Sequence, residues 1–202
     1  MPMPIQACLF DIGNVLVTFD YTRTFPALAG RTVNSYDEIH SYLSGMTNEL
    51  ETGRLPADQF IALAMEFIGG GVTRDEFLTA FTEIFAPILP VWEMLQSVRR
   101  RVPMHLFSNT SELHETYLLR RYPDFSWFAG GFFSWRLGVM KPDRAMYEAA
   151  LEALGVPAEQ IAYVDDLPAN IETGRALGMQ CHLFDRTNPE ALRVFLTELG
   201  LL

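Results

Sequence analysis

Apolar runs alternate with amphipathic segments along most of this chain, and the alternation predicts strands that alternate with helices. Five short apolar runs predict strands over residues 5–10, 104–107, 131–133, 161–164 and 181–184. Helices of ordinary length between such strands imply a parallel sheet with right-handed crossovers. We therefore expect an α/β fold with a Rossmann-like core, in which a parallel sheet is the middle of three layers.

Apolar residues at helical spacing mark two of the intervening helices: Val91, Leu95 and Val98 in one, and Tyr147, Leu151 and Leu154 in the other. Gly155 and Pro157 follow the second set, as expected after the end of a helix. A third helix is predicted over residues 170–177, and Gly178 closes it.

The stretch between about residues 17 and 90 departs from this alternation. It shows no convincing strand, and its helical segments are interrupted by Gly53, Pro56 and the triple glycine at 69–71. A folded unit inserted at a loop costs little stability when its two ends lie close together. We therefore expect a core of residues 1–17 and 88–202, a small inserted helical cap of residues 18–87, and hinges near 17–21 and 86–90.

The composition and net charge of the chain limit the classes of molecule that it could bind. The 202 residues are 49% hydrophobic and carry a formal net charge of −10, so the chain is a folded protein that binds nucleic acid and anionic membranes poorly. No apolar run approaches the roughly 20 residues that span a bilayer, and no signal peptide is predicted. An anionic substrate would have to be attracted locally, by a metal ion and a few cations.

Neither the cysteines nor the histidines suggest a metal site. Cys8 and Cys181 lie in apolar runs and fit no disulfide framework, which predicts buried free thiols in a reducing cytoplasm. His105, His114 and His182 lie in or beside apolar segments without ligand spacing. We expect these histidines to be core or surface residues.

Four polar clusters carry the candidate chemistry: Asp11 in FDIGNVLV, Ser108 in LFSNTS, Lys141 in GVMKPD, and the pair Asp165-Asp166 in YVDDLPANI. Three of them follow predicted strands, and ligands of parallel sheets bind beyond the carboxyl ends of the strands. A carboxylate nucleophile, a hydroxyl, an ammonium group and an acidic pair are the components of a Mg²⁺-dependent phosphoryl-transfer site. Each residue alone is more typical of a turn, a cap or the surface, so the hypothesis depends on the combination.

With these motifs the chain resembles the haloacid dehalogenase superfamily of hydrolases. The four motifs match in order and context over essentially the whole chain, and the insertion after the first motif resembles the subgroup with a helical, C1-type cap. The strings FDIGNVLV, LFSNTSELH, LGVMKPD and VDDLPANIETGRALGM look most like a bacterial branch that includes α-D-glucose-1-phosphate phosphatase.

The resemblance implies that Asp11 attacks phosphorus and forms an aspartyl-phosphate that water then hydrolyses. It implies that Mg²⁺ is bound by Asp11, by the backbone carbonyl of Gly13 and by the acidic pair. Asp166 aligns with the metal-binding Asp of the family, and Asp165 would bind directly or through water.

The resemblance also assigns residues around the phosphoryl group. Its oxygens would be bound by the Ser108 hydroxyl and by the backbone amides of Gly13, Asn14 and Asn109. Lys141 would neutralise charge on the nucleophile and the transferred group, and Asn170 would support the acidic loop through hydrogen bonds.

One position departs from the pattern of most phosphatases in this superfamily. They carry a second Asp two residues after the nucleophile, which protonates the leaving group, and Gly13 stands there instead. The loss of a general acid costs about 10²–10⁴ in rate. The similar branch shares the glycine, so water or a cap residue such as His40, Glu49 or Glu51 would stand in, or the enzyme would prefer a good leaving group such as an anomeric phosphate.

The expected function is a phosphoric monoester hydrolase that uses Mg²⁺ on a small phosphorylated metabolite, with sugar phosphates among the candidates. One alternative is a metal-independent haloacid dehalogenase, although the pair Asp165-Asp166 would repel a carboxylate substrate. The other is a phosphate-binding or regulatory protein with weak turnover, which Gly13 favours. The sequence leaves open the substrate and the choice between monomer and homodimer.

Overall fold

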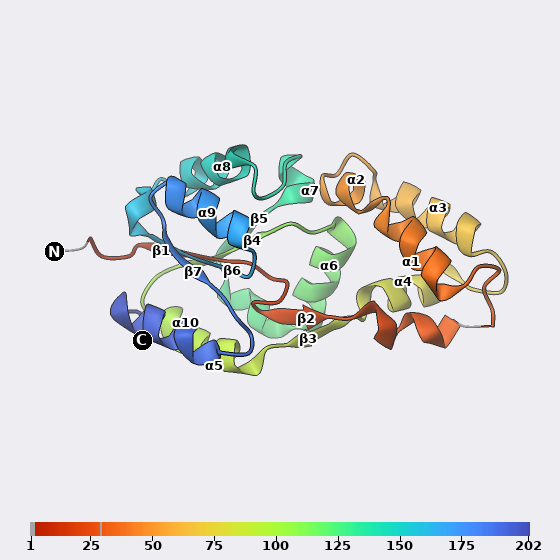
Figure 1. The fold of residues 1–202 in the computed structure, drawn as a ribbon, viewed down its shortest axis with the longest axis horizontal. Coiled ribbons are helices and arrows are strands. Elements are labelled where there is room, and N and C mark those ends of the chain that lie inside the picture. The colour runs from red at the N-terminus through yellow and green to blue at the C-terminus, as the bar shows by residue number, and fades with distance from the viewer. Residues whose placement is uncertain (1–2, 29) are drawn as a thin grey trace.

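The centre of the molecule is a five-stranded sheet, seen in a computed structural model that describes residues 3–28 and 30–202 (Figure 1). Its order is β5-β4-β1-β6-β7, and all four pairings are parallel. The strands are β1 (Ala7–Phe10), β4 (Met104–Ser108), β5 (Gly130–Phe133), β6 (Ile161–Asp165) and β7 (Gln180–Leu183). The predicted five-stranded parallel sheet is confirmed.

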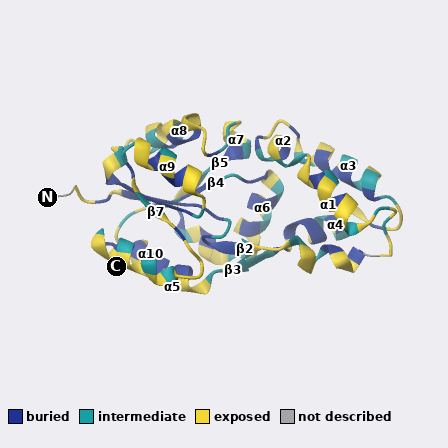
Figure 2. Ribbon diagram, viewed as in Figure 1, coloured by how far each residue is buried: buried dark blue, intermediate teal, exposed yellow. Residues whose placement is uncertain are grey.

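Two pairs of helices cover the sheet, one pair on each face (Figure 1). One pair is α5 (Leu89–Val98) and α10 (Pro189–Glu198), and the other is α8 (Arg144–Leu154) and α9 (Pro168–Ala176). Successive residues of a strand point to opposite faces, so Phe10 joins the apolar cluster of α5 and α10, and Leu9 joins that of α8 and α9. The central strands are therefore buried on both faces, as Figure 2 shows.

The predicted helices form, and further ones lie outside the predicted set: α6 (Glu112–Arg121) and α7 (Ser134–Leu137) between the strands, and α10 near the carboxyl end. Local caps define the boundaries of several helices. The Ser111 hydroxyl accepts from the His114 amide at the start of α6, and Gly155 ends α8 in the left-handed conformation. None of the helices in the described part of the chain is long and apolar enough to cross a bilayer.

A second group of helices lies beyond one end of the sheet, far from both termini (Figure 1). These are α1 (Tyr36–Ser44), α2 (Thr47–Glu51), α3 (Ala57–Ile68) and α4 (Arg74–Thr82), preceded by 3₁₀ turns at Tyr21–Arg23 and Phe25–Leu28. They enclose an apolar cluster of their own, centred on Phe60, Ile61, Phe77 and Phe81. We use "cap" for residues 18–87, a division that remains our proposal.

The prediction that residues 17–90 contain no strand was wrong. β2 (Val17–Phe19) and β3 (Phe85–Pro87) form an antiparallel pair in which Phe19 lies opposite Phe85. Runs of three residues are too short to show a period of two, and their pairing spans a long stretch of chain. The pair holds the two connections between core and cap side by side.

The strand order places a crevice at the carboxyl end of β1. From β1 the chain continues to β4 and β5 on one side of the sheet and to β6 and β7 on the other. Ligands of open α/β sheets bind at this kind of switch point. Asp11 follows β1 directly, Ser108 ends β4 and Asp165 ends β6.

Candidate active site at the switch point

Three carboxylates converge at the carboxyl end of β1. One oxygen each from Asp11, Asp165 and Asp166 lie within 4.8 Å of one another. The Asp11 amide donates to the Val164 carbonyl at 3.0 Å, which fixes the nucleophile loop to β6. The structure thus brings together acidic groups that are more than 150 positions apart in the sequence.

Lys141 is the only lysine of the chain, and its side chain is buried between two of these carboxylates. Its Nζ lies 3.0 Å from Asp11 Oδ1 and 2.6 Å from Asp165 Oδ2, and it donates to the Phe107 carbonyl at 2.7 Å. Burial alone would lower the pKa of Lys141, but the charges of Asp11 and Asp165 raise it above its ordinary value. The side chain is therefore an ammonium ion.

The Asn109 side chain holds the backbone at Lys141 in place. Its Nδ2 donates to the Lys141 carbonyl at 2.9 Å, and its Oδ1 accepts from the Lys141 amide at 2.8 Å. Asn109 follows β4, whereas Lys141 lies in the loop between α7 and α8. The two hydrogen bonds join these loops and fix where the ammonium group emerges.

Asp165 is fully buried and its two oxygens are saturated with hydrogen bonds. Oδ1 accepts from the Leu167 amide and from Asn170 Nδ2, both at 2.9 Å. Oδ2 accepts from the Tyr163 hydroxyl at 2.5 Å and from Lys141. A carboxylate held in this way positions its neighbours and has little capacity left for a further ligand.

Asp166 is less constrained than Asp165. Its hydrogen-bond partner, Asn14, has a different role from the predicted one. It is half-buried, and its Oδ2 accepts from Asn14 Nδ2 at 3.1 Å. Asn14 has a φ of 54°, and its amide donates to the Val17 carbonyl at 2.7 Å. Because the Asn14 amide already donates a hydrogen bond inside the loop, it is not available to bind a phosphoryl oxygen. In this respect the structure differs from the role predicted for Asn14. The side chain of Asn14 orients Asp166 instead.

The electrostatics of the cluster fit a divalent cation with oxygen ligands. Burial raises the pKa of Asp11; Lys141 opposes this shift, and the charge of Asp165 adds to it. Burial also raises the pKa of Asp166. Three carboxylates face a single ammonium group, and the uncompensated negative charge is costly in a buried site. Mg²⁺ prefers one or two carboxylates together with carbonyl and water oxygens.

A cavity of about 130 Å³ lies over the nucleophile loop, with room for several water molecules. The core contributes Gly13, Ser108 and Asn109 to its wall, and the cap contributes Tyr21 and Glu51. Ser108 is buried at the end of β4. Three of the expected phosphate-binding residues, Gly13, Ser108 and Asn109, therefore border one space, and cap residues line its other side.

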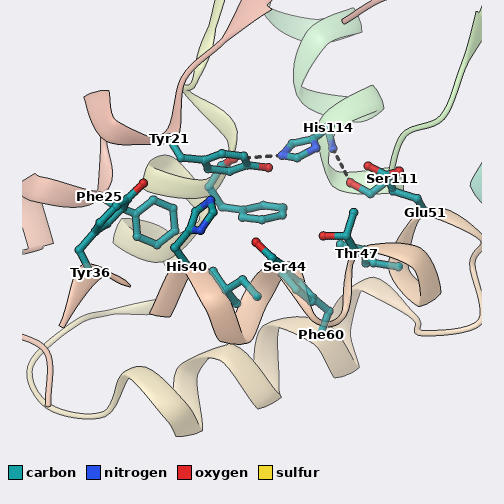
Figure 3. Close-up of a pocket in the computed structure, with 13 residues that line it drawn as sticks. Tyr21, Phe25, Tyr36, His40, Ser44, Thr47, Glu51, Phe60, Ser111 and His114 are labelled. Atoms are coloured by element: carbon teal, nitrogen blue, oxygen red, sulfur yellow. Dashed lines mark hydrogen bonds between the residues drawn. The ribbon is translucent and has the colours of Figure 1, made fainter. Parts of the chain in front are cut away.

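A second chamber inside the cap shares Tyr21, Glu51 and His114 with this cavity (Figure 3). His114 is buried, and its Nε2 lies 3.0 Å from the Phe81 carbonyl. Burial lowers the pKa of His114 to about 4, so the ring is neutral and Nε2 carries the proton that is donated.

Of the three residues shared by the two spaces, sequence reasoning named Glu51 as one of three candidate replacement acids, took His114 for a core or surface residue, and gave Tyr21 no role. Of the three cap candidates for a replacement acid, only Glu51 lines the cavity over the nucleophile loop. His40 lines the chamber but not this cavity, and Glu49 is exposed to solvent. Which face of a cap helix points at the crevice depends on how cap and core pack. Nothing in the local pattern of residues 47–51 reveals it.

The curated relatives of this chain include proteins that are named as phosphatases. The chain is 29% identical over 196 residues to a phosphatase of Mycobacterium tuberculosis, with 92% of this chain and 89% of the relative covered. It is 25% identical over 189 residues to the D-ribitol-5-phosphate phosphatase of Bacteroides thetaiotaomicron, with 87% and 90% covered.

Solved structures share the fold at lower identity. A haloacid dehalogenase family enzyme of Bacteroides thetaiotaomicron, in complex with magnesium and inorganic phosphate, superposes with a TM-score of 0.76 at 20% identity, covering 90% of this chain and 95% of that one. The L-2-haloacid dehalogenase of Xanthobacter autotrophicus superposes with a TM-score of 0.63 at 18% identity, covering 98% and 84%. The fold is thus shared by enzymes with different chemistry.

The family itself follows from the sequence match. A family model described as haloacid dehalogenase-like hydrolase matches residues 5–178, which include every candidate site residue discussed above. The chain therefore belongs to the haloacid dehalogenase-like hydrolases.

Proposed function

We propose that this hydrolase is a Mg²⁺-dependent phosphatase that cleaves a small phosphorylated metabolite through an aspartyl-phosphate on Asp11. The observation that carries the proposal is the position of Asp11, at the switch point of the sheet and in contact with a buried ammonium group beside two further carboxylates. The phosphatase names of two relatives support it.

In this mechanism Asp11 attacks phosphorus directly, because an ionised carboxylate needs no base to act as a nucleophile. Lys141 stays charged throughout and stabilises the negative charge that spreads over the transferred group. The Ser108 hydroxyl and the backbone amides of Gly13 and Asn109 bind the phosphoryl oxygens. These groups border the same cavity, which supports the assignment.

Asp11, the backbone carbonyl of Gly13 and Asp166 would hold the metal ion. When bound, Mg²⁺ supplies positive charge that offsets the carboxylates and the substrate phosphate. Asp166 accepts one side-chain hydrogen bond, whereas the oxygens of Asp165 accept four. We therefore assign direct ligation to Asp166, and to Asp165 a water-mediated contact and the positioning of Lys141.

Substitutions of Asp165 and Asp166 should affect the melting temperature in different ways. Asp165→Asn should lower the melting temperature without any metal, because Lys141 loses a buried charged partner. Asp166→Asn should leave the metal-free melting temperature nearly unchanged and remove the stabilisation by Mg²⁺, which is about 2.7 kcal/mol at a concentration of 100 Kd. Differential scanning fluorimetry with and without MgCl₂ measures both effects. A full Mg²⁺ shift in Asp166→Asn would contradict the assignment of Asp166.

The competing dehalogenase reaction uses the same nucleophile against carbon without a metal. The excess of carboxylates in the site disfavours it, since a carboxylate substrate would meet uncompensated negative charge. A screen of phosphorylated metabolites, sugar phosphates included, with Mg²⁺ and with EDTA separates the two functions. We expect phosphate release that EDTA abolishes. Halide release from a 2-haloacid that persists in EDTA would overturn the proposal.

A further inference from the structure

We propose that Glu51 of the cap is the general acid and base of this hydrolase, in place of the acid that the nucleophile loop lacks. The inference rests on the proposed phosphatase function. It places a catalytic residue at the end of α2, so the proton would reach the leaving oxygen from the cap side of the cavity.

The space beside residue 13 is filled by another side chain. A Cβ at Gly13 would lie 3.3 Å from Cε1 of Phe19, which is closer than most such contacts in proteins. Glu51 lines the same cavity as Gly13, together with Ser108 and Asn109. A carboxyl group is therefore present at the phosphoryl pocket, but it enters from the cap instead of from the nucleophile loop.

No hydrogen bond or ion pair to another side chain engages the Glu51 carboxyl among the residues that the structure describes. Carboxyl groups held in a largely buried place without a partner reduce stability, and such groups cluster at functional sites. Burial, followed by the negative charge of Asp11, raises the pKa of Glu51 to about 7, and Lys141 opposes the shift. Glu51 therefore exchanges a proton near neutral pH, as a general acid must.

The other ionisable groups on the cavity wall do not meet this requirement. His114 is neutral, and its Nε2 proton is donated to Phe81. Burial raises the pKa of Tyr21, with a further contribution from the charge of Glu51, so its hydroxyl stays protonated. Asp11 and Lys141 do not line this cavity and have roles in the transfer itself, and His40 lines the chamber behind Glu51 instead of the cavity.

A tight contact with the core fixes the position of α2. Gly53, two residues after Glu51, has a φ of 68°, and its backbone lies against the backbone of Trp135 in α7 so closely that a Cβ there would clash. Trp135 is anchored in turn, since its Nε1 donates to Glu115 at 2.7 Å. The contact between α2 and α7 is visible in Figure 1. Glu51 thus keeps a defined place over the site.

Glu51 donates one proton and regains one in each turnover. An Asp11 oxygen forms a bond to phosphorus while the bond from phosphorus to the leaving oxygen breaks, and the leaving oxygen takes the proton of Glu51. The resulting Glu51 carboxylate then accepts a proton from water as the water oxygen attacks phosphorus. The bond between the Asp11 oxygen and phosphorus breaks, which returns the Asp11 carboxylate and inorganic phosphate, and Glu51 is protonated again.

The chamber behind Glu51 indicates what the leaving group is like. Its wall carries the rings of Tyr21, Phe25, Tyr36, Phe60 and Phe81 (Figure 3). Among the residues that the structure describes, Glu51 is the only acidic one on the wall, and no Lys or Arg lines it. A leaving group with a second phosphate or a carboxylate would meet the Glu51 carboxyl there and no described Lys or Arg. The chamber holds about 50 Å³, less than the roughly 150 Å³ of a cavity that binds benzene, so it suits only a small apolar part of an uncharged alcohol.

The test compares Glu51→Gln with the wild type on two monoesters that differ in leaving group. p-Nitrophenyl phosphate releases a stable phenolate, whereas benzyl phosphate releases an alkoxide that needs a proton. We expect Glu51→Gln to lower kcat/KM for benzyl phosphate by about 10²-fold or more, and to lower it far less for p-nitrophenyl phosphate. Glu49→Gln, an exposed neighbour on α2, serves as the control and should resemble the wild type on both.

The pH profile gives a second readout. For benzyl phosphate the wild-type kcat/KM should fall as the pH rises through the pKa of Glu51, because the protonated form is the donor, and this limb should be absent in Glu51→Gln. Equal losses on both esters, or an unchanged profile, would overturn the role of Glu51 while leaving the phosphatase function intact. Absence of Mg²⁺-dependent hydrolysis of either ester by the wild type would instead remove the proposed function, and this inference with it.

Discussion

Replacing Asp11 with asparagine should lower kcat/KM for every phosphate ester by about 10⁴-fold or more, because the group that attacks phosphorus is removed. Asn has nearly the same shape, so the loss would not come from repacking. Asp11 also contacts Lys141 at 3.0 Å, and the ammonium group keeps its second partner, Asp165, in the variant. The fold should therefore survive.

Steady-state kinetics with p-nitrophenyl phosphate measure the effect, and circular dichroism checks the fold. Asp143→Asn is a matched control, since this Asp caps α8 near the site and accepts from the Ala145 amide at 3.0 Å. The Asp143→Asn variant should lose a fraction of the free energy of unfolding and keep most of the wild-type activity. Asp11→Asn with more than a tenth of the wild-type rate would be incompatible with a nucleophile at this position.

Lys141→Met should damage activity and stability together. Two buried carboxylates, Asp11 and Asp165, lose their counter-ion, and removal of one partner of a buried ion pair costs about 3–5 kcal/mol. The rate should fall by about 10²–10³, the usual effect of removing one preorganised electrostatic group. Urea unfolding and kcat/KM measure the two losses.

The stability loss should depend on pH in a defined direction. Burial raises the pKa of Asp11 and Lys141 lowers it, so removing the lysine raises the folded-state pKa further above its unfolded value. A raised acid pKa destabilises the folded state most above that pKa. The deficit of Lys141→Met should therefore shrink as the pH falls. Arg144→Met, which removes an exposed cation paired with Glu148, should change the unfolding free energy by less than about 1 kcal/mol at any pH.

The parts that the sequence predicted share one property, which is that their signal is local. Each buried parallel strand is a short apolar run, and Asp11, Ser108 and Asp165 stand at strand ends that parallel topology brings to one rim. Lys141 lies outside any strand, so parallel topology did not place it at this rim, and its candidacy depended on the combination of motifs and on the family resemblance. The structure shows why it belongs to the site, since Asn109 holds its backbone beside β4.

The parts that the sequence did not predict depend on distant packing. The β2–β3 pair forms between segments separated by the whole cap, and each segment is too short to show a pattern. The Asn14 amide is engaged because its loop closes on Val17 with a φ of 54°, which propensity does not reveal. Glu51 is placed by the contact between Gly53 and Trp135, whose positions differ by more than 80 residues.

In the proposed mechanism phosphorus becomes bonded to Asp11 during turnover. Rapid acid quenching of the reaction with p-nitrophenyl phosphate and Mg²⁺, followed by borohydride reduction and peptide mass spectrometry, tests it most directly. If Asp11 is the nucleophile, we expect homoserine at position 11 and unmodified Asp at positions 165 and 166. Phosphate release with position 11 unmodified and the phosphoryl group found on another residue would contradict it.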